Sequence, residues 1–328
     1  MKVALAIDGG NSKTDVAVVG EDGSLLGLAR GRGSSPHHLG GERSLDVIGA
    51  LVDELAPPER PRLALLLMAG VDFPEEERDL ARLAARRGWA ERVEVRNDTF
   101  AVLRAGTDRG WGIAVVCGAG INCVGVAPDG RHARFPALGP ITGDWGGGFD
   151  VGQEALFAAA RSEDGRGPRT RLERDVPEQF GLTSPEEVAV AIHRGHLDRH
   201  RLVELAPAVM AAAGDDAVAA GIVARLASEV VAFVRVAATR LGLDGEELEV
   251  VLGGGLLQEA APSLVAEIER GVHETAAQAV VRTTSAPAIL GSALLALDEL
   301  GSSADAKARL RAELEARTSP VPIGGVDG

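Results

Sequence analysis

The sequence predicts an α/β protein made of two related half-structures, on three observations. Its 328 residues suggest two domains rather than one. Residues 2–29 have the pattern of three strands joined by a glycine-rich turn and a hairpin turn. The same plan recurs from residue 112 to residue 130, and a repeat this long indicates a duplicated domain rather than a solenoid.

Apolar periodicity and turn residues define the elements of the first half. A helix after residue 97 can begin at an N-cap, because Asn97-Asp98-Thr99 follows a short strand. The predicted elements are, in order, strands at 2–8, 14–19 and 24–29, a loop at 31–41, a helix over 43–55, a strand at 63–68, a helix over 75–88, a strand at 93–95 and a helix to about residue 105.

The second half repeats the meander and adds a largely helical region at 153–240. Its predicted elements are strands at 112–117 and 122–127, helices over 154–161, 185–193, 202–213 and 215–241, a strand at 249–252, a helix over 262–277, an edge strand at 280–283 and helices over 288–300 and 303–315. The final segment, SPVPIGGVDG, has the composition of a disordered tail.

These elements predict three regions along the chain. The first domain covers 1–106, and the helix at 288–300 packs back on it. The second domain covers 107–287 and contains the helical insertion. Residues 301–328 form a charged helix and the tail.

The composition excludes several classes of partner. A formal net charge of -14 disfavours nucleic acid and anionic membranes, although a nucleotide can still bind through backbone amides and a metal. The two cysteines, Cys117 and Cys123, predict no disulfide framework and a reducing compartment. No signal peptide or apolar run of about 18 residues is evident, so we expect a cytoplasmic protein without membrane partners. We also expect a homodimer.

The segment Asp8-Gly9-Gly10-Asn11-Ser12-Lys13-Thr14 places a carboxylate at a strand end before a glycine turn. Bare backbone amides in such a turn can approach a phosphate closely, and Asp8 can hold Mg²⁺, largely through water. A plain hairpin turn explains the same residues, and DGG alone favours that simpler interpretation.

Two further glycine turns make a plain hairpin turn a less sufficient explanation. Gly118-Ala119-Gly120-Ile121-Asn122 has the same strand–turn–strand context and can bind the same polyphosphate. Gly253-Gly254-Gly255 lies between a buried strand and a helix, where a nucleoside can rest against backbone. The chain has no GxxxxGK[ST] segment, so it is not a P-loop NTPase.

Two carboxylates are candidates for binding or activating a substrate. Asp144, in the glycine-rich segment 143–148, can orient Mg²⁺ or a substrate hydroxyl, or lie in a solvated turn. Asp98 can accept the proton of an attacking hydroxyl, but local sequence favours an N-cap. His37 and His38 lack a third ligand at zinc spacing.

In this order, the sites resemble the N-acetylglucosamine kinase and CoA-dehydratase-activator (BadF/BadG/BcrA/BcrD-type) ATPase family. That family belongs to the superfamily of sugar kinases, actin and heat-shock ATPases. The resemblance covers residues 2 to about 298 and rests on IDGGNSKTD, GSSPHHLG, VRNDTFAVLRAG, VCGAGINCVGVAPDG, GPITGDWGGGFDVG, VVLGGGL and APAILGSALLAL.

The resemblance implies two duplicated actin-like (ribonuclease H-like) ATPase domains with an interdomain cleft. It implies Mg²⁺ and ATP as cofactors and an amino sugar as acceptor, with N-acetylglucosamine converted to its 6-phosphate. The implied roles are Asp98 as catalytic base, Asp8 and Asp144 for the metal, Gly10, Asn11, Ser12, Lys13, Thr14, Gly118, Gly120, Gly254 and Gly255 for ATP, and Ser35, His37, Asn97, Asp98, Asn122, Gly143 and Asp144 for the sugar.

One residue departs from the family's pattern. Kinases of this family commonly carry asparagine before the Pro-His of the sugar loop, and here Ser35 stands there. A hydroxyl offers fewer hydrogen bonds than an amide, so the identity of the sugar is open among N-acetylglucosamine, glucosamine, N-acetylmuramic acid and an unamidated hexose.

Two other functions are compatible with parts of the sequence. The same family contains ATPases that activate a CoA-ester dehydratase or reductase through an iron–sulfur cluster shared across a dimer, which needs cysteine thiolates on a common face. Cys117 and Cys123 instead flank a glycine turn on two strands predicted to be buried. A non-catalytic nucleotide or sugar sensor is the other alternative, and neither a DNA-binding motif nor a basic patch supports it.

Overall fold

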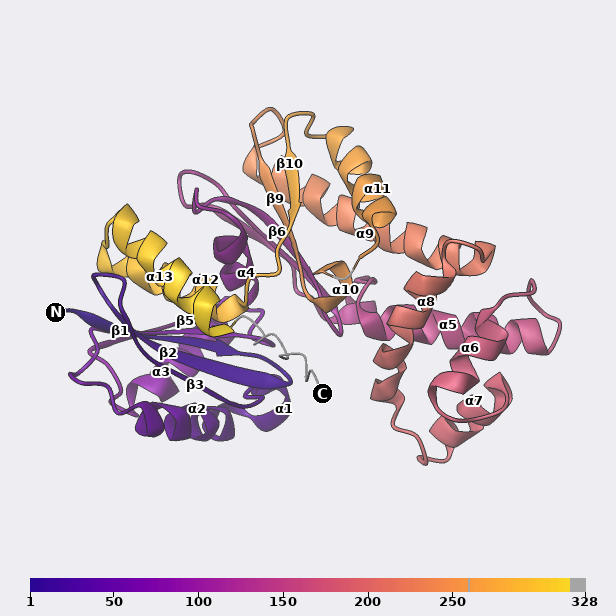
Figure 1. Cartoon of the computed structure of the whole chain (residues 1–328), viewed down its shortest axis with the longest axis horizontal. Coiled ribbons are helices and arrows are strands. Elements are labelled where there is room, and N and C mark those ends of the chain that lie inside the picture. Colours follow the sequence, from indigo (N-terminus) through magenta and orange to yellow (C-terminus); the bar gives the residue numbers. More distant parts are fainter. Residues whose placement is uncertain (259, 319–328) are drawn as a thin grey trace, which may run out of the picture. The chain divides into compact units, whose positions relative to one another are not determined.

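The computed structural model describes residues 1–258 and 260–318, and the tail expected to be disordered lies outside them. The chain forms two units (Figure 1). Unit 1 comprises Met1–Asp108 and the segment from Ala286 onward, and unit 2 comprises Arg109–Ser285.

Unit 1 is built on a five-stranded sheet of order β3-β2-β1-β4-β5. The strands are β1 (Val3–Gly9), β2 (Lys13–Gly20), β3 (Leu25–Arg32), β4 (Leu63–Met68) and β5 (Arg92–Asn97). β2 is antiparallel to β1 and β3, whereas β4 runs parallel to β1 and β5. Every residue of β1 and β4 is buried, as expected for central strands covered on both faces.

Helices cover both faces of this sheet. One core contains the odd-numbered side chains of β1 and packs under α2 (Gly41–Leu55) and α3 (Pro74–Ala85). The other contains Ala4 and Ala6 and packs under α12 (Ala288–Leu300) and α13 (Ala304–Thr318), with α4 (Thr99–Gly106) contributing Ala101. A Cβ added to Gly291 of α12 would lie 1.8 Å from the carbonyl oxygen of Ala101, so α12 and α4 touch through their backbones.

Unit 2 repeats the plan of unit 1. Its sheet has the order β10-β9-β6-β7-β8, which read backwards is the same meander followed by two parallel strands. The strands are β6 (Gly112–Cys117), β7 (Ile121–Val126), β8 (His132–Arg134), β9 (Glu249–Gly253) and β10 (Val280–Thr283). The predicted α/β class with two duplicated sheets is confirmed.

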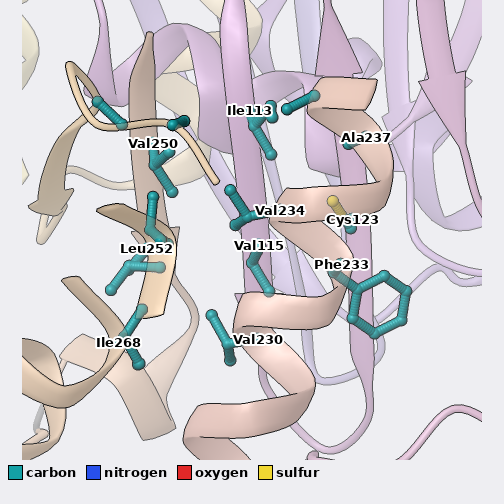
Figure 2. Packing of buried hydrophobic residues seen from close by; sticks show 14 of the residues in the cluster. Ile113, Val115, Cys123, Val230, Phe233, Val234, Ala237, Val250, Leu252 and Ile268 are labelled. Atoms are coloured by element: carbon teal, nitrogen blue, oxygen red, sulfur yellow. The ribbon is translucent and has the colours of Figure 1, made fainter. Parts of the chain in front are cut away.

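The helices of unit 2 form a sheet-covering pair and a separate bundle. The pair is α9 (Ala217–Leu241) with α11 (Pro262–His273), and Figure 2 shows Val230 and Val234 of α9 against Ile113 and Val115 of β6. The remaining helices, most of them in the bundle, are η1 (Gly139–Ile141), α5 (Gly148–Glu163), α6 (Leu172–Gln179), α7 (Pro185–His193), η2 (Arg199–Leu205), α8 (Ala206–Ala212) and the short α10 (Gly255–Gln258).

Two predicted elements and one expectation drawn from composition need correction. The continuous helix over 202–213 is instead η2 followed by α8, because Pro207 occupies the first turn of a new helix. The loop at 31–41 contains the one-turn helix α1 (Pro36–Leu39). The expectation that the chain has no apolar run long enough to span a membrane was wrong, since the 25-residue helix α9 is long and apolar enough to do so. One face of α9 nevertheless packs in the core of unit 2 (Figure 2).

Candidate active site

The first glycine turn lies at the end of unit 1's sheet where β1 meets β2. The backbone N–H of Gly10 donates to the carbonyl of Lys13 at 2.9 Å. A Cβ on Gly33, just after β3, would lie 2.0 Å from the carbonyl oxygen of Asn11, so this position needs glycine. The side chains of Asn11, Ser12 and Lys13 are exposed, which leaves them accessible to a phosphate.

Thr14 differs from the other residues of that turn. Its side chain is fully buried, and its hydroxyl donates to the Ser34 hydroxyl at 2.7 Å. The hydroxyl of Ser44 in turn donates to the Ser34 carbonyl. Thr14 therefore ties the glycine turn to the loop after β3, and its assignment to ATP stays a prediction.

Asp8 is a nearly buried carboxylate at the end of β1. Burial raises its pKa to about 7, and repulsion from Asp98 and then Asp15 adds to the shift, while Lys13 and Arg30 act in the opposite direction. A divalent cation would favour the ionised form of Asp8. A single carboxylate such as Asp8 fits a Mg²⁺ that is bound mainly by phosphate and water. Among the described residues, no group of three or more His, Cys, Asp or Glu side chains could hold a metal.

Asp98 follows β5, at the N-cap position of α4, yet its side chain does not cap the helix. Burial raises its pKa to about 6 and repulsion from Asp72 contributes, whereas the backbone N–H groups of Asp98 and Thr99 lower it. The capping acceptor is instead Asn97, whose Oδ1 accepts from the N–H of Thr99 at 3.0 Å. The N-cap explanation for Asp98 is therefore wrong.

The side chain of Asn97 is saturated by internal hydrogen bonds. Its Nδ2 donates to the carbonyl of Val71 at 3.1 Å and to Asp72 Oδ1 at 2.9 Å, and its Oδ1 also accepts from the Thr99 hydroxyl at 2.5 Å. These bonds fix the end of β5 against the loop after β4. They make Asn97 a residue that positions Asp98, and its predicted contact with a sugar is untested.

The predicted sugar loop packs against the end of β4. Ser35 is almost completely buried and donates to the carbonyl of Ala69 at 3.0 Å. Gly70, with φ 72°, fits beneath the loop, and a Cβ there would lie 2.7 Å from Cβ of His37. The imidazole of His37 remains exposed on α1. Ser35 thus anchors the loop, and His37 and His38 are both exposed on it.

In unit 2, the second glycine turn is closed by the start of α5. Gly118 N–H donates to the Gly120 carbonyl at 2.9 Å, and Gly148 N–H donates to the Gly118 carbonyl at 2.8 Å. A Cβ on Gly147 would lie 2.2 Å from Cα of Gly120. The glycines of segment 143–148 are thus partly explained by contact with the turn, rather than with a ligand alone.

The third glycine turn lies beside the second, because β6 and β9 are parallel neighbours. Gly254 has φ 83°, and a Cβ there would lie 2.4 Å from the Cys117 carbonyl oxygen. Gly118 and Gly255 both line one cavity of about 500 Å³. That volume is within the range of about 300–1,000 Å³ that is typical of small-molecule sites.

Asn122 and Asp144 are not among the described residues that line this cavity. Oδ1 of Asn122, on β7, accepts from the N–H of Cys123 at 2.7 Å. Asp144 accepts a hydrogen bond from the Thr142 hydroxyl, and Gly143 beside it has φ 82°. Their sugar and metal roles stay predictions.

Several residues at these sites have no local sequence signal. Asp15 lies opposite Asp8, which only the register of the hairpin reveals. Asp72 reaches Asn97 from the loop after a different strand. Half of the residues that line the cavity come from η2 and α8, which precede β9 by dozens of residues.

The sequence of this chain is similar to those of known proteins. A model of the BadF/BadG/BcrA/BcrD ATPase family matches residues 5–296. An N-acetylmuramic acid/N-acetylglucosamine kinase of Clostridium acetobutylicum is 28% identical over 266 residues, covering 78% of this chain and 86% of the relative. An N-acetyl-D-glucosamine kinase of Dictyostelium discoideum is 25% identical over 316 residues, covering 90% and 98%.

Solved structures share the fold. A putative N-acetylglucosamine kinase from Chromobacterium violaceum superposes with a TM-score of 0.69 at 24% identity, covering 90% of this chain and 99% of the other. A ROK family glucokinase from Streptomyces griseus, solved with glucose and AMPPNP, gives a TM-score of 0.57 at 17% identity, covering 89% and 98%.

Proposed function

The chain belongs to the BadF/BadG/BcrA/BcrD ATPase family, and from that premise we propose that it is an ATP-dependent kinase that phosphorylates an amino sugar. N-acetylglucosamine is the proposed acceptor and its 6-phosphate the product. The names of the two curated relatives support this acceptor class, and N-acetylmuramic acid is the second sugar named among them.

The observation that carries the proposal is the pair of buried carboxylates at one edge of unit 1's sheet. Asp8 lies near the end of β1 and Asp98 follows β5, and burial, with a further contribution from neighbouring carboxylates, raises the pKa of each. A nucleotide hydrolase needs the metal-binding carboxylate. A transferase to an alcohol also benefits from a second carboxylate that accepts a proton.

In this mechanism, Asp98 accepts the proton of the sugar hydroxyl as the hydroxyl oxygen forms its bond to the γ-phosphorus of ATP. The bond between the γ-phosphorus and the bridging oxygen breaks, and ADP leaves. Mg²⁺, when bound at Asp8, would neutralise phosphate charge. A base with a pKa of about 6 is ionised at neutral pH and still takes a proton readily.

The chain's other groups hold the reactants. The exposed side chains of Asn11, Ser12 and Lys13 offer donors to phosphate oxygens, and Asn97 fixes the base through four internal hydrogen bonds. The loop with Ser35 and His37 is the proposed sugar contact on unit 1. We also propose that the protein forms a homodimer and is cytoplasmic.

The iron–sulfur ATPase is the second candidate, and the cysteines argue against it. Cys117 and Cys123 are almost completely buried, and burial raises the pKa of both thiols well above its ordinary value. Cluster ligands must be thiolates that reach the shared face of a dimer. Both thiols instead pack in the core of unit 2.

The deciding experiment is a coupled ADP-release assay of the purified protein with four sugars: N-acetylglucosamine, glucosamine, N-acetylmuramic acid and glucose. We expect ADP release that needs both Mg²⁺ and an added amino sugar, and a product that matches the 6-phosphate by NMR. Rapid ATP hydrolysis that no sugar changes would refute the kinase proposal.

A further inference from the structure

The cavity of unit 2 is lined both by glycines of the turns and by apolar side chains. Gly118 and Gly255 border it where the two glycine turns lie side by side. Val203 of η2 and Pro207 and Met210 of α8 form another part of its wall. If the proposed function holds, the glycine turns take the polyphosphate of the nucleotide, and the cavity beside them takes the nucleoside.

The described side chains around this cavity offer a base no strong hydrogen-bond donor or acceptor. Among the described residues, every side chain that lines it lacks nitrogen and oxygen, and the Met210 sulfur is only a weak acceptor. The lining residues are Gly118, Gly148, Val203, Ala206, Pro207, Met210, Ala211, Gly255, Leu256 and Ala261.

Discrimination between purines depends on polar groups. Adenine, hypoxanthine and guanine share one ring system and differ in the substituents at positions 2 and 6. A site with buried donors and acceptors matched to those substituents rejects the wrong base by about 10⁴–10⁵, whereas an apolar pocket rejects a close isostere by only about 10². The lining side chains place this cavity in the second group.

We propose that the nucleotide substrate of this protein is the purine nucleoside 5′-triphosphate class rather than ATP alone. The base is held by van der Waals contact between α8 and the glycine-rich ends of β6 and β9. The adenine, hypoxanthine and guanine nucleotides then differ in affinity by less than about 100-fold.

The test measures nucleotide binding without any sugar. Calorimetric titration of the whole protein with Mg-ADP, Mg-IDP and Mg-GDP should give dissociation constants within about 100-fold of one another. A preference for ADP of more than about 1,000-fold, or no binding of any of the three, would overturn the inference.

A matched pair of variants tests where the base lies. Met210→Gln brings an amide of similar length to the wall and should change the ADP-to-GDP ratio by roughly 5-fold or more, whereas Met210→Leu should leave it within about 2-fold. Ala211→Ser serves as a second polar variant if Met210→Gln melts at a lower temperature. An unchanged ratio in a folded polar variant would overturn the assignment of the base to this wall.

The two proposals fail separately. ADP and GDP that bind alike, with no sugar phosphorylated, would refute the kinase and leave this inference standing. Sugar phosphorylation by ATP, with GDP binding more than about 1,000-fold weaker, would refute the inference and leave the kinase standing.

Discussion

Asp8 on β1 and Asp15 on β2 are direct cross-strand partners, and both carboxylates are buried. They are not equivalent, because Arg30 holds Asp15 through two hydrogen bonds, from Nε to Oδ1 at 2.5 Å and from Nη2 to Oδ2 at 3.0 Å. Asp8 has no ion-pair partner among the residues that the structure describes. The neighbouring pair therefore contains one neutralised carboxylate and one that a bound cation would stabilise.

This asymmetry predicts that Asp8→Asn stabilises the nucleotide-free protein. The pKa of Asp8 is about 7 in the folded chain, whereas the ordinary pKa of an aspartate is 3.8, so the folded state keeps a proton that the unfolded state loses between about pH 4 and pH 7. The free energy of unfolding therefore falls as pH rises through that window, by up to about 4 kcal/mol. Urea unfolding at pH 5 and pH 8 should show the variant's advantage growing with pH.

Asp53→Asn, at an exposed position on α2, is the control and should show no such dependence. Mg²⁺ with nucleotide should raise the melting temperature of the wild type more than that of Asp8→Asn. An Asp8→Asn variant less stable than the wild type at pH 8 would contradict the electrostatic account.

Asp98→Asn should lower kcat by about two to four orders of magnitude, because the amide cannot accept the hydroxyl proton. The melting temperature should not fall, since Asn97 rather than Asp98 provides the capping oxygen of α4. Nucleotide affinity should barely change. Steady-state kinetics, nucleotide binding and a melting curve of the same variant decide the matter, and near-normal turnover would remove Asp98 from the mechanism.

The activity should also depend on pH through Asp98. The base must be ionised, and its pKa is about 6, so log kcat/KM should rise with pH up to about 6 and then level off. Asp72→Asn removes a negative charge that raises this pKa, so the acid limb should move to lower pH. The titration of ATP affects the wild-type and Asp72→Asn profiles equally, so the difference between them reports on the enzyme. If kcat/KM falls at the same acidic pH in both proteins, another group controls the pH dependence.

Ser35→Asn should alter the ratio of kcat/KM between acetylated and free amino sugars by roughly 5- to 150-fold. The side chain is buried, bonded to the Ala69 carbonyl and confined by Gly70, so a larger amide must shift the loop or take its hydrogen bond. Ser35→Ala separates the two effects by losing the bond without adding volume. If neither variant changes the ratio, this loop does not contact the amino substituent.

Anaerobically purified protein should carry no iron–sulfur cluster. Two thiols in the core of unit 2 cannot reach a shared surface without unfolding β6 and β7. Iron analysis and a visible spectrum are sufficient, and stoichiometric iron with absorbance near 400 nm (roughly where thiolate-bound clusters absorb) would favour the alternative ATPase.

The duplicated sheets could be predicted from the sequence because their signals are local. Strand runs such as residues 63–68 are continuous and apolar, and glycine turns separate the paired strands. The break at Ala206 was missed because Pro207 fits the first turn of a helix as well as it interrupts one, and periodicity alone does not separate the two.

The candidate site was only partly predictable. Asp8 and the glycine turns stand out in single segments, whereas the environment of Asp98 depends on Asn97, Asp72 and Val71, which come from the ends of two strands. Asn97 and Asp98 are adjacent, and both are good N-cap residues. Only the side-chain positions show that Asn97 provides the capping oxygen and leaves Asp98 for another role.

The contribution of α12 and α13 to unit 1 imposes an order on biosynthesis. Ala4, Ala6, Leu63 and Leu65 are covered by side chains that leave the ribosome only after all of unit 2. At about 5–20 residues per second, the wait between Asp108 and the end of α12 is roughly 10–40 s. During that time only α4 partly covers one apolar face of the nascent sheet. A chain truncated before residue 288 should therefore aggregate or be retained by chaperones.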